Sequence, residues 1–222
     1  MSITSNQNKT CAVIPFYNEE RTIAEVINRA LNFVNAVIAV NDGSTDNSKK
    51  NVPKNERIIC LENIVNEGKG VALNKGFAES TKRGFEFTIT LDSDLQHIPD
   101  KIPDFILALN NYDIVIGNRL NDLSDMPLHR ILSNKISSGL LSLKTGQKIL
   151  DSQSGFRGFR TKILNDILPS FSGYEAESEI LINAARKNYK IGFVPIPAIY
   201  ADEKSKIKPV QIIFSFFKTL FI

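Results

Sequence analysis

The first half of the chain alternates short apolar runs with segments whose apolar residues recur every three or four positions. Apolar runs rich in β-branched residues predict strands, and the three-four spacing predicts helices with one buried face. We expect a helix over 23–34, with Asn18 as its N-cap, and a second helix over 69–81. The expected strands cover 10–15, 36–40, 57–61 and 85–91.

Strands that are apolar throughout and separated by helices indicate a parallel sheet with both faces covered. In such α/β sheets, ligands bind beyond the carboxyl ends of the strands. The polar residues after the first, second and fourth strands should therefore converge on one edge of the sheet. The sequence predicts that this edge holds the functional site.

The second half of the chain is less regular. Strands are expected at 113–117 and 156–159, helices at 128–143 and 176–187, and a strand-like segment at 191–200 that two prolines interrupt. The helix over 128–143 has an apolar face, which favours an ordinary core helix over one that contacts a membrane. This face consists of Leu128, Ile131, Leu132, Ile136 and Leu140.

Composition narrows the class of protein. The 222 residues are 42% apolar and 23% charged, which is typical of one globular domain. The 27 basic residues exceed the 24 acidic ones by only three, too few to argue for a nucleic-acid partner. Cys11 and Cys60 resemble small core residues, and two histidines, His97 and His129, are too few for the usual zinc site. Residues 1–9 are polar and unlike a signal peptide, so we expect a cytoplasmic chain.

The segment 210–222 does not fit this picture, because it is apolar on almost every side and Lys218 is its only charge. As a helix it would reach about 20 Å, short of the ~30 Å hydrocarbon core of a bilayer. It is therefore expected to pack on the core, to lie in the membrane interface, or to precede a longer hydrophobic segment.

Two carboxylates, Asp92 and Asp94, follow the expected fourth strand, and Gln96 comes shortly after them. Such closely spaced acids repel each other unless a cation or hydrogen-bond donors compensate. Oxygen ligands suit Mg²⁺ or Mn²⁺, usually together with water and substrate phosphates. The alternative is an Asx-type turn that closes the strand.

Two further segments are candidates for binding a nucleotide. Asp42 follows a buried strand, either as a turn residue or as an acceptor for a base or ribose. Gly68, Lys69 and Gly70 begin a helix, where backbone N–H groups and a cation suit an anion. The spacing of their glycines excludes a phosphate-binding P-loop.

Together these segments resemble the family 2 glycosyltransferases, whose nucleotide-sugar-binding fold is called GT-A. The form of the later motifs looks most like the dolichol-phosphate mannose synthase and polyprenyl-phosphate glycosyltransferase branch. The matching segments, in the family's order, are VIPFYNEERTIAEVI (13–27), VNDGSTDNS (40–48), NEGKGVALNKGF (66–77), LDSDLQHIPDKI (91–102), DIVIGNR (113–119) and DSQSGFRGFR (151–160). The resemblance implies a Rossmann-like, mostly parallel sheet with helices on both faces.

The resemblance also assigns roles to individual residues. The nucleotide-sugar would be bound by Pro15, Tyr17, Glu19, Asp42, Lys69 and Asp92. The divalent metal would be held by Asp94 and Gln96, and catalysis would depend on Asp94, Arg119 and Arg130. The acceptor would be bound by Arg119, Arg130, Ser154, Arg157, Ser205 and Lys206. The branch often has an arginine near residues 200–204, where this chain offers Lys204.

The implied organisation is a GT-A domain over 1–206, followed by a hydrophobic helix over 207–222, for which the membrane interface is one of the expected locations. Its nucleotide-sugar half would cover about 10–100 and its acceptor half about 101–206. The enzyme would lie on the cytoplasmic face of a membrane.

The implied reaction is an inverting, metal-dependent transfer of a sugar, from a GDP-mannose or UDP-hexose type of donor, to a polyprenyl phosphate. A phosphate monoester is already anionic at neutral pH and needs no base, only cations that position it. The first rival is transfer to a hydroxyl, which requires a base, and the acids nominated for it are Asp151 and Glu179. The second rival is a non-catalytic nucleotide-sugar-binding or membrane-scaffolding protein.

Overall fold

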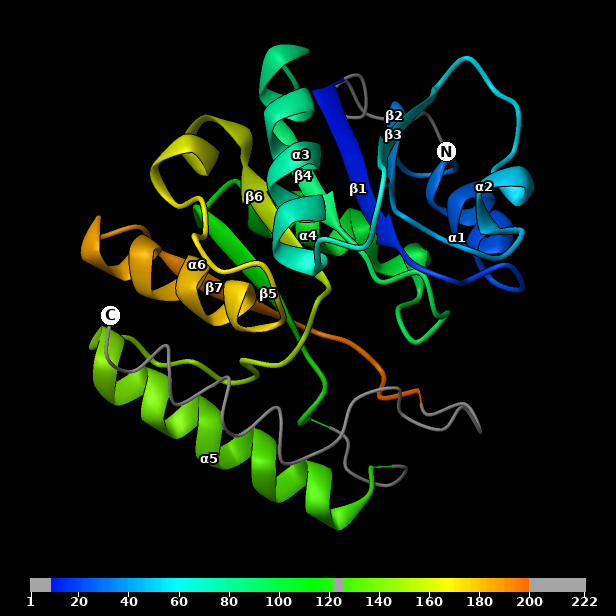
Figure 1. Cartoon of the computed structure of the whole chain (residues 1–222). Coiled ribbons are helices and arrows are strands. Elements are labelled where there is room, and N and C mark those ends of the chain that lie inside the picture. The colour runs from blue at the N-terminus through cyan, green and yellow to red at the C-terminus, as the bar shows by residue number, and fades with distance from the viewer. Residues whose placement is uncertain (1–8, 122–125, 200–222) are drawn as a thin grey trace.

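A seven-stranded sheet in the order β3-β2-β1-β4-β6-β5-β7 forms the centre of the molecule. The computed structural model describes residues 9–121 and 126–199 (Figure 1). The strands are β1 (Thr10–Phe16), β2 (Ala36–Asp42), β3 (Ile58–Asn63), β4 (Phe87–Thr90), β5 (Ile114–Asn118), β6 (Arg157–Arg160) and β7 (Ile191–Pro195). The predicted α/β class with a mostly parallel sheet is confirmed.

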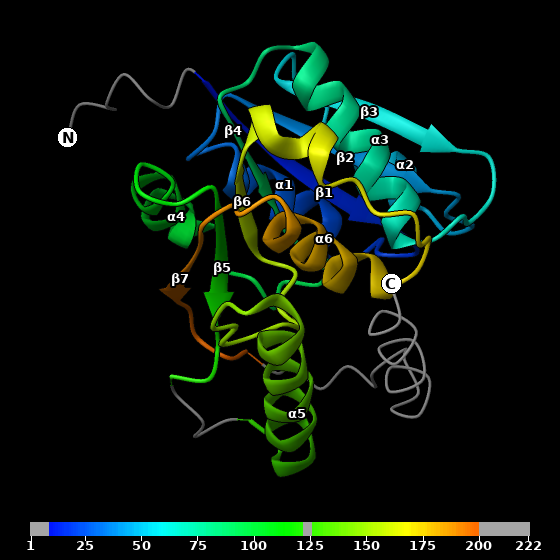
Figure 2. The same cartoon turned by 90° about the vertical axis from the view of Figure 1, so that its left-hand side faces the viewer.

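Helices cover both faces of this sheet (Figures 1 and 2). They are α1 (Ile23–Ala30), α2 (Ser48–Asn51), α3 (Lys69–Lys82), α4 (Ile102–Ala108), α5 (Leu128–Thr145) and α6 (Glu175–Arg186), with 3₁₀ turns at Pro99–Lys101 and Thr161–Asp166. Successive residues of a strand point to opposite faces, so β1 contributes Ala12 and Ile14 to the core under α1 and α4. Cys11 and Val13 join the core under α3 and α6, where Phe159 packs against Phe77 with ring centroids 5.3 Å apart.

One expectation about local structure was wrong. Asn18 is not the cap of α1: it has a φ of 55°, and the helix begins five residues later at Ile23. The Asn18 side chain instead accepts hydrogen bonds from the N–H groups of Thr45 and Asp46, which ties the β1 loop to the β2 loop. Strand β6 runs antiparallel to β4 and β5, which fits a sheet that is mostly, not entirely, parallel. The strand-like segment expected over 191–200 forms β7, which ends at Pro195, the first of the two prolines expected to interrupt it.

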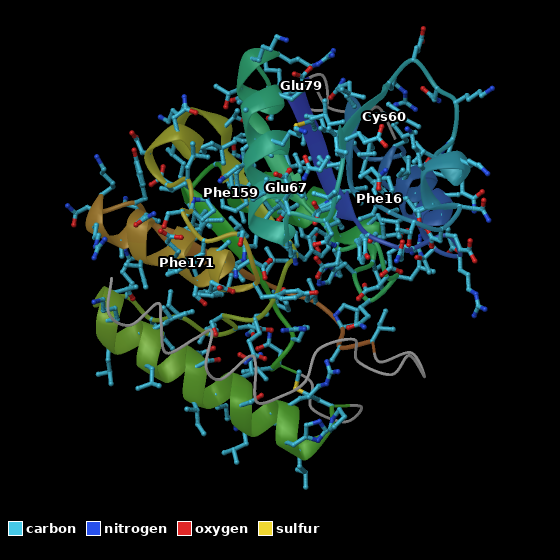
Figure 3. All side chains as sticks on the ribbon, in the orientation of Figure 1. Phe16, Cys60, Glu67, Glu79, Phe159 and Phe171 are labelled. Atoms are coloured by element: carbon cyan, nitrogen blue, oxygen red, sulfur yellow. The ribbon has the colours of Figure 1, made fainter. Side chains whose placement is uncertain are left out.

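Burial also differs from expectation at two places. Cys60 is exposed on β3, which forms an edge of the sheet (Figure 3), so it is not a core residue. The apolar face of α5 does not enter the core either: Leu128, Leu132 and Ile136 are 83%, 61% and 54% exposed. The face of α5 that is buried is mostly polar, and it comprises Asn134, Ser137, Ser138 and Leu141.

Some predictions fall on residues outside the described ranges. These are the C-terminal helix, Lys204 and the acceptor-binding residues Ser205 and Lys206. Across 9–121 and 126–199, the helices are too short or too polar for any of them to traverse a lipid bilayer.

Candidate active site

The carboxyl ends of β1 and β4 bring Glu19, Asp92 and Asp94 together. Burial and the nearby charge of Asp92, with a smaller contribution from Glu19, raise the pKa of Asp94 to about 6. Asp94 accepts a hydrogen bond of 3.0 Å from the N–H of Gln96, and Leu95 between them has a φ of 62°. The tight turn therefore keeps Asp94 and Gln96 close together in a locally acidic environment.

Lys69, at the start of α3, forms ion pairs with Asp92 after β4 and with Glu177 on α6. Its ammonium lies 2.5 Å from Asp92 Oδ1 and 3.0 Å from Glu177 Oε1, and 5.9 Å from the centre of the Tyr174 ring. Burial opposes the charged forms, but the mutual attraction outweighs it, so the pKa of Asp92 is lowered and that of Lys69 is raised. Asp92 and Lys69 are therefore both ionised at neutral pH.

Sequence reasoning did not identify Glu177 or His97 as parts of this site. Glu177 stands in the first turn of α6, where an acid normally needs no explanation beyond the helix dipole. His97 is 3% exposed and accepts a hydrogen bond from the N–H of Asp92 through Nδ1, and its ring lies against Phe156 at 5.4 Å. Burial lowers the pKa of His97 to about 4, so it is neutral and holds the Asp92 loop in place.

The expectation that the glycines beside Lys69 offer free N–H groups to an anion was wrong. The N–H of Gly68 donates to Asp42 Oδ2, and the N–H of Gly70 donates to Ser172 O. Asp42 is 4% exposed, and its other oxygen accepts hydrogen bonds from Asn63 and from the N–H of Glu67. Asp42 thus positions the segment that leads into α3, and a nucleoside contact by Asp42 stays a prediction.

The other residues predicted to contact the nucleoside lie at the end of β1. Pro15 is buried within this strand and pairs with Val40 of β2. Tyr17 follows the strand and is 39% exposed, so its ring is accessible to a ligand. A nucleoside contact by Pro15, Tyr17 or Glu19 remains a prediction.

Arg119 extends from the end of β5 into a buried ion pair. Its Nε lies 2.8 Å from Asp151 Oδ2 and its Nη2 lies 2.9 Å from Asp151 Oδ1, a parallel two-bond arrangement. The charge of Arg119 also contributes to lowering the pKa of Asp92. Arg119 and the strand-end acids therefore belong to one electrostatic site. Arg130 lies on α5 and is half-buried.

The acceptor-side loop 151–157 is more buried than its predicted role implied. The guanidinium of Arg157 is 1% exposed and donates to the carbonyl oxygens of Ser152, Ser154 and Glu177. These contacts show a group that braces the loop against α6. Ser154 is also fully buried, with no hydrogen-bond partner for its hydroxyl among the described residues.

Neither acid nominated as a base has a free carboxylate. Asp151 is fully buried and accepts hydrogen bonds from Arg119 and Asn134, which together outweigh burial and lower its pKa. Glu179 is 4% exposed and accepts hydrogen bonds from Ser170 and from the N–H of Phe171. The Asp151 carboxylate thus fixes Arg119 and Asn134, and the Glu179 carboxylate fixes the segment at Ser170 and Phe171.

Gly155 lies directly against the Asp92 carboxylate. A Cβ at this position would lie 2.5 Å from Asp92 Oδ2, which is too close. The carboxylate cannot move aside freely, because its other oxygen is paired with the Lys69 ammonium. Gly155→Ala should therefore displace Asp92 and lower the turnover about 10–100-fold by misplacing groups at the reacting centre. Steady-state kinetics, with circular dichroism as a check on folding, measures this loss.

The matched control is Gly139→Ala on α5, where a Cβ meets nothing within 4 Å. Full activity of Gly155→Ala would contradict the placement of Asp92 in the site.

The donor set fits a divalent cation that is completed by substrate. Among the described residues, no three His, Cys, Asp or Glu side chains are grouped to hold a metal ion. Asp94 and Gln96 would supply only two oxygen ligands, and Mg²⁺ and Mn²⁺ commonly take the remainder from water and phosphates. Because burial and Asp92 raise the pKa of Asp94, a cation at this place would relieve an unfavourable charge.

Comparison with known proteins decides the family. The model of "Glycosyl transferase family 2" matches residues 11–168. The chain is a family 2 glycosyltransferase. UDP-N-acetylglucosamine--dolichyl-phosphate N-acetylglucosaminyltransferase of Methanococcus voltae is 33% identical to this glycosyltransferase, over 86% of this chain and 85% of the relative. Dolichol-phosphate mannosyltransferase of Pyrococcus furiosus is 29% identical, over 90% of this chain and 59% of the relative.

A solved structure shows the fold of this glycosyltransferase independently. Glucosyl-3-phosphoglycerate synthase of Mycobacterium tuberculosis, bound to Mn²⁺, UDP and phosphoglyceric acid, matches with a TM-score of 0.75 at 20% identity. The match covers 97% of this chain and 79% of that one. The resemblance to family 2, to its polyprenyl-phosphate branch and to the GT-A fold is confirmed.

Proposed function

We propose that this glycosyltransferase moves a sugar from a nucleotide-sugar to a polyprenyl phosphate, with inversion, at the cytoplasmic face of a membrane. The observation that carries the proposal is that Asp92 lies close both to the acid Asp94, whose pKa it raises, and to the cations Lys69 and Arg119. Acids that attract a metal ion thus lie beside cations suited to phosphate groups.

The donor side of the proposal rests on Asp92, Asp94 and Gln96. Asp94 and Gln96 would hold Mg²⁺ or Mn²⁺, which when bound stabilises the charge that develops on the departing diphosphate. Lys69 fixes the Asp92 carboxylate, and Tyr17 offers an exposed ring at the end of β1. Mn²⁺ and UDP in the structural neighbour, and the UDP-sugar in the name of the Methanococcus relative, support this assignment.

The acceptor side rests on charge. A polyprenyl phosphate needs positive groups that hold its oxygen in line with the anomeric carbon, and Arg119 and Arg130 are the residues proposed for this task. Asp151 and Glu179 both have oxygens engaged by the protein, so neither supplies the base that a hydroxyl acceptor requires. Two relatives carry dolichyl phosphate or dolichol phosphate in their names, which supports the same acceptor class.

The membrane is the proposed location because α5 presents apolar side chains outward. Its sequence, LHRILSNKISSGLLSLKT, holds four basic or imidazole residues and none with a carboxylate. Basic helices with one apolar face bind at the surface of anionic bilayers. We propose that residues 1–206 form the catalytic domain and that 207–222 add a second membrane contact.

The membrane proposal predicts a separation of binding from catalysis. Leu132→Glu, at a position that is 61% exposed on α5, should reduce binding to anionic vesicles about tenfold or more. Its turnover with a short polyprenyl phosphate in detergent should stay within about twofold of the wild type, because a surface substitution perturbs the fold little. Vesicle co-sedimentation measures the first effect.

The control for Leu132→Glu is Leu107→Glu on α4, an apolar residue that is 70% exposed. Equal losses of vesicle binding in the two variants would contradict a specific role for α5.

The acceptor assignment is tested with two matched lipids. The enzyme is incubated with Mn²⁺ and a panel of UDP- and GDP-sugars, and with either a polyprenyl phosphate or the corresponding polyprenol. We expect glycosylation of the phosphate and none of the alcohol, because the carboxylates of the two nominated bases, Asp151 and Glu179, are both engaged by hydrogen bonds within the protein. Transfer to the alcohol, or to saccharides in place of the phosphate, would overturn the assignment.

A further inference from the structure

Helix α5 is attached to the domain through its polar face. Ser138 Oγ donates to Asn134 Oδ1 at 2.9 Å, and the N–H of Ser152 donates to Ser138 Oγ at 2.9 Å. Ser137 and Ser152 share a further hydroxyl contact of 2.9 Å. Hydrogen bonds are directional, so this network fixes the position and rotation of α5 more tightly than apolar contacts of the same size would.

The network continues from α5 into the ion pair of Arg119. Asn134 is 1% exposed, and its amide nitrogen donates to Asp151 Oδ1 at 2.7 Å. The same carboxylate accepts the two parallel hydrogen bonds from the Arg119 guanidinium and one more from the Arg119 backbone N–H. Asp151 thus connects a residue on α5 to the guanidinium proposed to bind the acceptor phosphate.

The position of Arg119 matters at the reacting centre as well. Its charge is one of those that act on Asp92 and on His97. A movement of α5 that shifts Asn134 would also move Asp151, which is hydrogen-bonded to it. The Arg119 guanidinium, which is paired with Asp151, would then move relative to the acceptor and donor sides.

We propose that Asn134 and Asp151 are positioning residues, which set the Arg119 guanidinium according to the position of α5. The inference rests on the proposed function, and it adds that the helix facing the membrane and the phosphate-binding arginine are mechanically connected. Neither positioning residue touches the substrates: both act through Arg119. The connection gives the lipid surface a direct influence on the geometry of the acceptor site.

A double-mutant cycle tests this connection. Binding of a short polyprenyl phosphate in detergent is measured by calorimetry for wild type, Asn134→Ala, Arg119→Gln and the double variant, together with KM for donor and acceptor. Asn134→Ala should weaken acceptor binding about tenfold and leave the donor KM unchanged, with no further effect in the Arg119→Gln background. Ser133→Ala, which removes a hydroxyl that donates to the carbonyl of Arg130 on the same helix, is the control.

The possible results separate three cases. Equal effects of Asn134→Ala in both backgrounds, or equal losses of donor and acceptor binding, would overturn the connection. Wild type that neither binds nor glycosylates a polyprenyl phosphate would instead refute the proposed function, and the inference with it. Should Asn134→Ala fail to fold, Asn134→Ser keeps a polar partner for Ser138 while being too short to reach Asp151, and the same cycle applies.

Discussion

Asp94→Asn is expected to abolish metal-dependent turnover, with a loss of about 1,000-fold or more, while making the metal-free protein more stable. The loss follows from removing the charged ligand proposed for the cation, whose stabilisation of the leaving group is worth several kcal/mol. Asparagine keeps the oxygen that accepts the N–H of Gln96, so the turn survives. Mn²⁺ with UDP should raise the melting temperature of wild type and leave that of the variant unchanged.

The gain in stability of Asp94→Asn follows from the raised pKa of Asp94. The folded protein binds this proton more tightly than the unfolded chain, since the pKa rises from 3.8 to about 6. Stability contributed by the protonated form is therefore lost as the pH rises from about 4 to 6, and above pH 6 the ionised form destabilises the fold. Asparagine avoids this penalty, so the variant should be more stable by up to about 3 kcal/mol at pH 7.

Urea unfolding of both proteins at several pH values measures this difference. The gain should shrink towards zero near pH 4, where Asp94 is protonated in wild type. Asp104→Asn, at an exposed acid on α4 paired with Lys101, is the control and should change stability little at any pH. A variant that is less stable than wild type at pH 7 would contradict the electrostatic description of the site.

Arg157→Leu is expected to lower the free energy of unfolding by about 3–5 kcal/mol. The substitution leaves three buried carbonyl oxygens, those of Ser152, Ser154 and Glu177, without their hydrogen-bond donor. Each such acceptor costs about 1–3 kcal/mol, and relief of the buried charge offsets part of the total. Chemical denaturation measures the change.

Arg157 was predicted to bind the acceptor, but its buried hydrogen bonds to three carbonyl oxygens indicate a structural role. The two roles predict different effects of substitution. Arg157→Lys should lose part of the stability, because one ammonium cannot replace a planar group with several donors. Any loss of activity should affect donor and acceptor alike. A stable Arg157→Leu protein with a raised KM for the acceptor alone would restore the predicted role. Arg83→Leu, which breaks an exposed pair with Glu79, is the surface control.

The alternation of apolar runs and helical spacings was enough to predict the sheet and the place of the site. The strands that carry Asp42 and Asp92 are buried on both faces, so their apolar runs are continuous and their ends are clear in the sequence. The Asp92–Asp94–Gln96 spacing also identified the acidic turn directly. Helix α4 was missed, because its seven residues are too few to show the recurring three-four spacing clearly.

Pairings between distant segments could not be read from the sequence. Glu177 and His97 take their roles from Lys69 and Asp92, which only the fold brings next to them. The direction of β6 depends on its neighbours, since a strand of only four residues fits either orientation. For α5 the spacing predicted the apolar face correctly. The opposite, polar face is the buried one, because Asn134 and Ser138 form hydrogen bonds with the domain.

The most direct test of the central claim is one reaction in which both products are identified. The enzyme is given Mn²⁺, a nucleotide-sugar and a polyprenyl phosphate, and the masses of the lipid and of the released nucleotide are determined. The account predicts a lipid heavier by one sugar and a nucleoside diphosphate, both lost on chelation of the metal and in Asp94→Asn. A lipid heavier by a sugar phosphate with a nucleoside monophosphate, or free sugar with an unchanged lipid, would contradict it.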